Sequence, residues 1–428
     1  RSMNGYFNLG YSFDDRYLMD FSLRENGSSV FGASKRYIGT WSVGLGWNLH
    51  KERFIADHLT WIDFLKLRAS IGNPGNQNFS SSKTLTTFNF QLASMNYFGM
   101  GAVLNQLGNP DLDWQITLDK NIGIDMILID KRLNITADYY HKVTDPLLIN
   151  ISMPLSSGTS SYLTNMGKQI SQGLTLSASY YIIQKLDQRF SWLVRGNLRT
   201  QKTKLDKIGN KLDELNKSGQ GHNTVRYYNG ADPDDIWAVK SAGIDPSTGR
   251  ELFYDKEGNY TYDFSYDNEV ICGNTRPKIE GVIGTSLNYK GFSVSMNFRY
   301  QTGASVFNEA LFNKVENISV SGLNKNQDKR ALYERWQNPG DKVRFKDIAN
   351  AASTPMSSRF IQKENVLSME SVYVGYEFYE GWIKKIGLSN LKIQASMRDV
   401  FRASTIKSER GTLYPFARSL ELGLSFNF

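Results

Sequence analysis

The chain of 428 residues carries a formal net charge of +8, and 13% of its side chains are aromatic. Its Lys and Arg residues are scattered rather than clustered, which argues against a nucleic-acid partner, and no run of about 18 apolar residues predicts a membrane-spanning helix. Cys272 is the single cysteine and the four histidines lie far apart, so neither a disulfide nor a cysteine or histidine metal cluster is predicted.

Extended segments with a twofold alternation of apolar and polar side chains recur from the first residues onward. Phe7, Leu9 and Tyr11 share one face of the first segment, while Asn8 and Gly10 share the other. Because strand side chains alternate between the two faces of a sheet, this pattern predicts β-strands. The pattern is found in 13 segments, namely residues 7–13, 17–24, 41–48, 65–71, 115–128, 133–144, 173–182, 190–200, 279–289, 292–301, 369–378, 391–399 and 416–428.

The last segment, FARSLELGLSFNF, indicates where such strands would lie. Leu422 and Leu424 fall on one face, Gly423 and Ser425 fall on the other, and Phe428 ends the segment. A strand of a soluble sandwich usually carries Lys and Glu on its wet face. An apolar face opposite small polar residues is instead typical of the wall of a membrane barrel, whose outer face meets lipid.

The connections between the predicted strands alternate in length. Short or moderate links are predicted at residues 14–16, 50–64, 130–132, 184–188, 290–291 and 379–390, and long ones at 27–36, 73–113, 145–172, 202–278, 302–368 and 402–415. Short periplasmic turns and long extracellular loops are the pattern of outer-membrane barrels. The alternative is a large soluble β-protein, but loops of about 70 residues are unusual in a sandwich. We therefore predict an all-β, transmembrane antiparallel β-barrel.

Few residues suggest chemistry. Asp232, Asp234 and Asp235 are a weak candidate for a calcium site, but their spacing fits a turn better than a calcium loop. No nucleophile with a base, phosphate loop or positioned carboxylate pair is recognisable, so we predict neither an enzyme nor a cofactor. Residues 325–336 predict a helix within a loop.

Several segments resemble the SusC/RagA family, the TonB-dependent outer-membrane importers of Bacteroidetes. The segments that carry the resemblance are DRYLMDFSLRENGSSVFG (15–32), LKLRASIGNPGNQ (65–77), YLTNMGKQISQGLTL (162–176), GIDPSTGRELF (243–253), ERWQNPGDKVRFKD (334–347) and the final hairpin at 359–376 and 388–401. Glu25-Asn26, Thr175 and Arg398-Asp399 differ from the residues usual at their positions in the family.

The resemblance implies that residues 1–428 are the C-terminal part of a barrel. Family members are about twice as long and have a plug domain, a TonB box and roughly 22 strands. We recognise no plug and no TonB box in this sequence, and 13 strands alone would leave open edges in lipid, where unpaired backbone groups are costly. We therefore expect a companion polypeptide, or the remainder of a longer product, to close the barrel.

The family's activity sets the functional expectation. It implies import of an oligosaccharide or a peptide across the outer membrane, with a SusD-like surface lipoprotein as a lid and with TonB-ExbB-ExbD acting through the plug. Pairs of importer and lid can themselves form dimers. Two other functions stay open: a structural or adhesive surface protein without transport, and a passive porin.

Two sets of side chains are candidates for contacts in such a machine. Basic residues on the predicted lumen face would pair with plug carboxylates or contact an anionic substrate; they are Arg24, Arg68, Arg195, Arg199, Arg299 and Arg398, with Lys66 and Lys392. Loop aromatics would stack on substrate or pack against the lid lipoprotein; they are Tyr97, Phe98, Tyr227, Tyr228, Trp237 and Trp336.

The two longest loops, 202–278 and 302–368, are predicted to form the platform for the lid. They carry anchor-type residues, including Phe307 and Phe312, that a free loop would have little reason to carry. We expect that deleting either loop releases the lid while the barrel still assembles.

Overall fold

The computed structural model describes residues 2–28, 36–76, 84–153, 156, 158–159, 161–185, 187–318, 324, 327–350, 352–379, 381–407 and 418–428. Parts of the predicted loops, of the last predicted strand and of the family-like segments lie outside the described residues. The longest of these parts are residues 29–35, 77–83 and 408–417. Within the described residues, no helix is long and apolar enough to cross a membrane.

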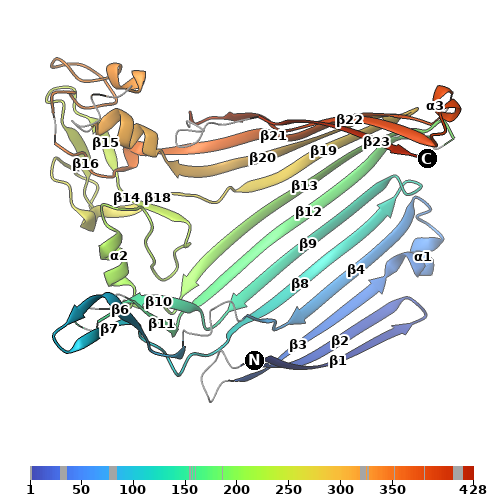
Figure 1. Cartoon of the computed structure of the whole chain (residues 1–428), viewed down its shortest axis with the longest axis horizontal. Helices are drawn as coiled ribbons and strands as arrows, with labels where there is room; N and C mark the ends of the chain where they lie inside the picture. The colour runs from blue at the N-terminus through green and yellow to red at the C-terminus, as the bar shows by residue number, and fades with distance from the viewer. Residues whose placement is uncertain are drawn as a thin grey trace. The chain divides into compact units, whose positions relative to one another are not determined.

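A large antiparallel sheet is the main element of the fold (Figure 1). Its path through the described residues has 13 strands in chain order: β1 (Ser2–Phe13), β2 (Tyr17–Ser28), β3 (Tyr37–Asn48), β4 (Ile62–Gly72), β8 (Gln115–Leu128), β9 (Leu133–Thr144), β12 (Lys168–Lys185), β13 (Phe190–Asp206), β19 (Ile279–Tyr289), β20 (Phe292–Phe307), β21 (Ile361–Phe378), β22 (Asn390–Ser404) and β23 (Leu420–Asn427). All 13 predicted strands are confirmed.

The loops contain smaller elements. Short β5 (Gly75–Asn76) pairs with β8, and four small antiparallel sheets are formed by β6 (Thr87–Asn96) with β7 (Gly99–Gln106), β10 (Leu148–Ser152) with β11 (Ser161–Asn165), β14 (Asp235–Val239) with β18 (Glu269–Asn274), and β15 (Ser241–Ile244) with β16 (Glu251–Tyr254) and β17 (Tyr260–Thr261). The helical turns are η1 (Leu49–Lys51), α1 (Arg53–Ala56), α2 (Asp213–Gly219), η4 (Tyr266–Asn268), η5 (Leu311–Glu316, a π-helix), η7 (Lys329–Leu332), η8 (Ser358–Phe360) and α3 (Trp382–Lys385).

Tight turns join strands where short links were predicted. Asp14 and Asp15 both have positive φ, at 51° and 49°, and the Arg16 amide donates to the Phe13 carbonyl. Lys290 and Gly291 repeat this geometry, with φ of 44° and 91°. Two consecutive positive φ values are the signature of the type I′ hairpin turn, which matches the twist of the flanking strands.

Several strands are longer than their alternation predicted. β12 begins at Lys168 instead of residue 173, β13 continues to Asp206, and β21 begins at Ile361 instead of residue 369. These extensions lie at the ends that lead into the long loops, where polar residues such as Gln172, Lys202 and Lys204 interrupt the apolar face. The backbone ladder therefore continues after the sequence signal has ended.

The chain divides into two compact units, which are described one at a time. The first unit comprises residues 1–182, 197–217 and 227–233, and the second comprises residues 183–196, 218–226 and 234–428. In the first unit, cross-strand partners place Ile122 beside Tyr139 and Tyr139 beside Leu174 on one face. In the second unit, Val294, Val374, Ala395 and Leu422 form a similar row across four strands.

Large apolar side chains on these faces remain exposed. Ile122 is 63% exposed, Leu9 is 53% exposed and Leu422 is 78% exposed. A soluble monomer rarely exposes apolar patches larger than a few hundred Å², whereas a sheet face covered by such residues suits contact with lipid. The buried apolar clusters lie among the loops instead: Leu147, Met166, Leu205, Ile208 and Leu212 in the first unit, and Leu311, Val315, Phe345 and Phe360 in the second.

Candidate functional site

The polar face of the first unit carries small side chains at its centre. Gly10 opposes Asp20, Asp20 opposes Gly44, and Gly44 opposes Ser70 across β1 to β4. A hollow of about 460 Å³ lies over this row, and a second hollow of about 320 Å³, lined in part by Arg24, shares Ser22, Ser42 and Ser70 with it. The alternation therefore leaves a polar, open surface on the wall opposite the apolar face.

Arg68 forms an ion cluster with the wall itself. Its guanidinium lies 2.7 Å from Asp125 on β8 and 2.9 Å from Asp138 on β9. Gly123 makes this approach possible, because a Cβ there would lie 3.0 Å from the Arg68 Cζ and 2.4 Å from the Asp138 Oδ1. We expected such an arginine to pair with a plug carboxylate or with substrate, whereas neighbouring strands already supply two carboxylates.

The other basic residues of the polar face differ in their surroundings. Arg299 pairs with Glu370, which stands at an irregularity in the register of β21, and Arg195 donates to Asn297 over 3.1 Å. Arg199 donates to the Gln201 side chain two residues further along β13. Arg24 lines the smaller hollow, and Arg398 is an exposed partner of Ser371 in the ladder between β21 and β22.

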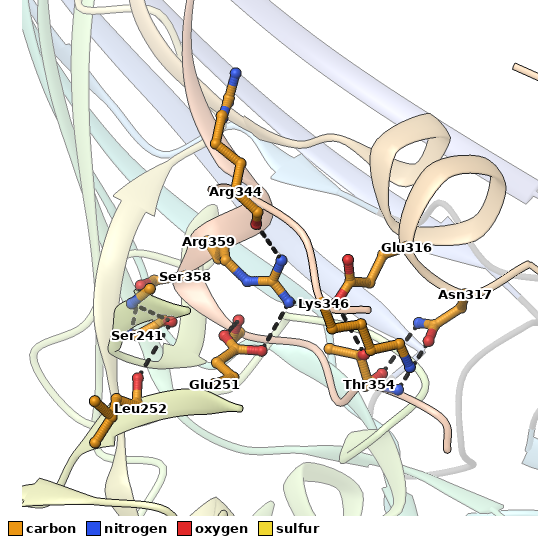
Figure 2. A network of polar contacts seen from close by, with 12 residues as sticks. Ser241, Glu251, Leu252, Glu316, Asn317, Arg344, Lys346, Thr354, Ser358 and Arg359 are labelled. Carbon is orange, nitrogen blue, oxygen red and sulfur yellow. Dashed lines mark hydrogen bonds and ion pairs between the residues drawn. The ribbon is translucent and has the colours of Figure 1, made fainter. Parts of the chain in front are cut away.

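The second unit contains a compact loop body, which we define as its described residues in 218–226, 234–278 and 305–360. At its centre, the Arg359 guanidinium lies 2.8 Å from the Glu251 carboxylate and 2.6 Å from the Glu316 carboxylate (Figure 2). The three side chains are 10%, 7% and 0% exposed. Glu251 belongs to one long loop and Glu316 to the other, so one buried arginine joins the two.

Further contacts strengthen this ionic clamp of Arg359, Glu251 and Glu316. Ser357 is fully buried and donates to the other Glu251 oxygen at 2.6 Å, and Thr354 donates to Glu316 at 3.0 Å. Burial alone lowers the pKa of Arg359, but pairing with the two carboxylates outweighs burial and raises it above its usual value. Arg359 lies in η8, two residues before β21 begins at Ile361, so the clamp holds the loop body at the entry to a wall strand.

Phe360, the residue after Arg359, belongs to an aromatic cluster. The rings of Phe307, Phe312 and Phe360 pack at centroid distances of 5.1 to 5.9 Å, beside buried Leu311 and Val315. Phe307 and Phe312, which we expected to contact a partner, thus have an internal reason to be aromatic.

Two of the family-like segments interlock. In the 334–347 segment, the Trp336 indole donates to the Pro246 carbonyl of the 243–253 segment over 2.9 Å. Gly249 has a φ of +67°, and a Cβ there would lie 2.5 Å from the Trp336 ring. The glycine is therefore required both by its backbone conformation and by the indole that packs on it.

Asp245 organises the same hairpin. Its carboxylate accepts hydrogen bonds from the Tyr262 hydroxyl, from the Ser247 amide and hydroxyl, and from the Thr248 hydroxyl. The Tyr262 hydroxyl, followed by Ser247, holds the pKa of Asp245 well below its usual range.

The helix predicted at 325–336 is not formed in the described part of this segment. The described part of this segment forms only the short η7, and the Arg335 side chain donates to the carbonyls of Ala331 and Lys346. Arg335 is buried, and its hydrogen bond to the Lys346 carbonyl is a tertiary contact that outweighs helix propensity. The helix prediction was wrong for this reason.

The predicted contact aromatics differ in their surroundings. Tyr97 and Phe98 stand at the tip of the β6–β7 hairpin and are 96% and 93% exposed, and Tyr228 is 39% exposed. Tyr227 packs against the Leu147 cluster, and Trp336 is engaged with Pro246. Trp237 lies in β14 opposite Ile271.

The three aspartates of the weak calcium candidate are directed to different partners. Asp232 accepts from the Thr203 backbone amide, Asp234 pairs with Arg276, and Asp235 accepts from the side-chain amide of Asn274. Over the described residues, no group of three or more His, Cys, Asp or Glu side chains is placed to hold a metal ion.

Comparisons with known proteins agree with this geometry. The family described as TonB dependent receptor-like, beta-barrel matches residues 1–324. The chain belongs to this family. It is an outer-membrane protein, and it is similar to SusC, as its sequence indicated.

Named relatives extend over nearly the whole chain. TonB-dependent receptor P39 of Formosa agariphila is 27% identical over 98% of this chain and 44% of its own length, and SusC of Bacteroides thetaiotaomicron is 26% identical over 98% and 43%. The solved structure of the RagAB peptide transporter superposes with a TM-score of 0.82 at 21% identity, covering 95% of this chain and 44% of that one. The chain spans less than half the length of these relatives.

Proposed function

We propose that this chain forms the C-terminal wall of a TonB-dependent importer that takes up an oligosaccharide or a peptide together with a SusD-like surface lipoprotein. The observation that carries the proposal is the match of residues 1–324 to the TonB-dependent receptor barrel family. It agrees with the large antiparallel sheet, which has one apolar face and one polar face. In this proposal the plug, the TonB box and the remaining strands are supplied by segments or chains other than these 428 residues.

The polar face is the proposed path for substrate. Small residues such as Gly10, Gly44 and Ser70 leave room beside the wall, and Asp20 and Arg24 offer one charge of each sign to a passing ligand. Arg68 and Arg299 are already paired with carboxylates of the wall, so Arg24 is the better candidate to contact an anionic substrate. Arg24→Gln should slow uptake of an anionic substrate more than uptake of a neutral one of equal size.

The loop body is the proposed platform for the lid. Its internal clamp and aromatic cluster make a preorganised surface, which lowers the entropic cost of binding a partner. The exposed tip formed by Tyr97 and Phe98 is a second proposed contact. The interface should exceed about 1,000 Å², as a stable contact between two proteins requires.

The clamp changes what loop deletion is expected to do. Deleting residues 202–278 would remove Glu251 and deleting residues 302–368 would remove Glu316 and Arg359. The second deletion leaves Glu251 without its cation, and the first leaves Arg359 with one carboxylate instead of two. We therefore expect each deletion to disorder the remaining loop as well as to release the lid.

The test identifies the polypeptides that co-purify with this chain and the class of ligand that the cells take up. The protein is purified from outer membranes, and every polypeptide in it is identified by intact mass and N-terminal sequencing. Uptake of labelled oligosaccharides and of labelled oligopeptides is then measured in cells. The proposal expects a surface lipoprotein in the particle and saturable uptake of one ligand class. A particle with no plug-bearing segment or partner chain, in cells that take up neither class, would favour an adhesive or structural protein.

A further inference from the structure

The outward face of the first unit changes from apolar to cationic along one row of its sheet. Lys120 on β8 opposes His141 on β9, and His141 opposes Gln172 on β12. On the other face, the hydroxyls of Ser171 and Thr203 lie 3.3 Å apart. Their chain neighbours Gln172 and Lys202 are therefore adjacent on the outward face.

Lys204 extends the same face by one step. Along β13, exposed and buried residues alternate: Lys202 and Lys204 are exposed, whereas Thr203 and Leu205 are buried, at 3% and 5% exposure. Because side chains alternate along a strand, the two lysines point away from the buried side of β13. We call Lys120, His141, Gln172, Lys202 and Lys204 the cationic row.

The row directly beneath is apolar. Ile122, Tyr139 and Leu174 are cross-strand neighbours, one side-chain step toward the short turns, and are 63%, 47% and 40% exposed. One side-chain step toward the long loops, Leu118, Val143 and Ile170 are cross-strand neighbours again but are only partly exposed. The highly exposed apolar band therefore ends at the cationic row on the side of the long loops. In an outer-membrane barrel that side faces outward from the cell.

Across the described residues, Lys120, Lys202 and Lys204 form no ion pair, although neighbouring lysines do. Asp119 is held on the polar face by Lys142 at 2.8 Å, and Asp145 is held by Lys207 at 3.4 Å. Asp206, two residues after Lys204 on β13, accepts from the Lys207 backbone amide at 2.9 Å, so these three carboxylates are each engaged with another group.

Among the described residues of the second unit, no such row is found. There the residues at the upper end of the outward face are Tyr300, Leu367 and Ala403, which are cross-strand neighbours on β20, β21 and β22. The concentration of cations is a specific property of β8 to β13 and is not required of every wall strand.

We propose that the cationic row binds the phosphate groups of an anionic lipid of the outer leaflet, whose acyl chains lie on the apolar band below. Lys120 and Lys202 stand three strand spacings apart, roughly 14 Å, and their flexible stems let both ammonium groups reach one headgroup. Ammonium-to-phosphate contacts are charge-assisted hydrogen bonds, and Gln172 and His141 add donors between them. This inference depends on the outer-membrane location and not on the import activity.

The test uses native mass spectrometry and thermal unfolding of the complete protein purified in detergent. The probes are bis-phosphorylated lipid A, the same lipid after enzymatic removal of its phosphates, and inorganic phosphate. The variant is K120Q/K202Q/K204Q. The matched control is K211Q/K217Q/K256Q, which removes the same charge from loop positions that are not on the outward face.

The proposal expects wild-type protein to retain phosphorylated lipid A and to gain thermal stability from it. Each lysine near an anionic headgroup contributes roughly fivefold, so the row variant should bind at least about tenfold less, while the control variant binds as wild type does. The dephosphorylated lipid and inorganic phosphate should have no effect on wild type. Equal binding of both lipids would overturn the proposal without any variant. A matching effect of inorganic phosphate alone would overturn it as well, because the site would then be an ion site and not a headgroup site.

Discussion

Arg359→Met is the sharpest test of the loop body. The substitution keeps a long apolar stem but removes the cation that lies between Glu251 and Glu316, which are 7% and 0% exposed. Breaking a buried pair by removing one partner costs about 3–5 kcal/mol, because the remaining charges stay desolvated. Here two carboxylates lose one shared partner, so we expect the upper part of this range.

The effect should appear in both long loops at once. Hydrogen exchange measured by mass spectrometry on the purified protein would follow β15–β16, which carries Glu251, and η5, which ends at Glu316. A loss of about 4 kcal/mol corresponds to roughly a thousandfold faster exchange from locally opened states. Exchange in the wall strands should stay slow.

Two variants make the result specific. Arg344→Met removes an exposed arginine, whose pair with Glu334 spans 3.5 Å with both side chains more than half exposed, and should cost less than about 1 kcal/mol. The triple change R359M/E251Q/E316Q removes all three charges and should restore much of the lost protection. If Arg359→Met speeded exchange in only one loop, or no more than Arg344→Met does, the clamp would not couple the loops.

Three further substitutions test other parts of the structure. Leu422→Lys on the apolar face should cost roughly 2–4 kcal/mol when it lies near the bilayer midplane, while Ser425→Lys on the polar face should be mild; equal outer-membrane assembly of both would reverse the face assignment. Gly123→Val should expel the Arg68 guanidinium and cost about 1–3 kcal/mol of stability in denaturant unfolding, and an unchanged midpoint would contradict the close approach. Asp245→Asn should speed exchange of its hairpin at neutral pH: the folded pKa is depressed, so the carboxylate stabilises the fold above its ordinary pKa and loses this effect as pH falls through the folded value. The difference from wild type should therefore vanish only in strong acid.

The sequence predicted the wall well because lipid imposes a rule on every strand. One face must be apolar over the whole band, so Leu9, Ile122 and Leu422 report their orientation without knowledge of their neighbours. The tight turns were equally local, since Asp14-Asp15 and Lys290-Gly291 interrupt the alternation by two residues.

The clamp could not be predicted in the same way. Arg359 and Glu251 are 108 residues apart, and no periodicity links them. The Arg68 cluster depended on strand register, which places Asp125 and Asp138 beside it. For the loop aromatics, residue type indicated burial but did not distinguish an internal core, as for Phe312, from a surface for a partner, as for Tyr97.

Energy dependence of uptake tests the central claim most directly. Cells that produce the protein with its natural partners are given the labelled ligand that they accumulate, with and without functional TonB, and initial rates are compared below saturation. An importer whose wall is this chain should lose nearly all uptake without TonB while the amount of protein in the outer membrane stays the same. Uptake that continues at the same rate without TonB, and that does not saturate, would show a passive porin and contradict the account.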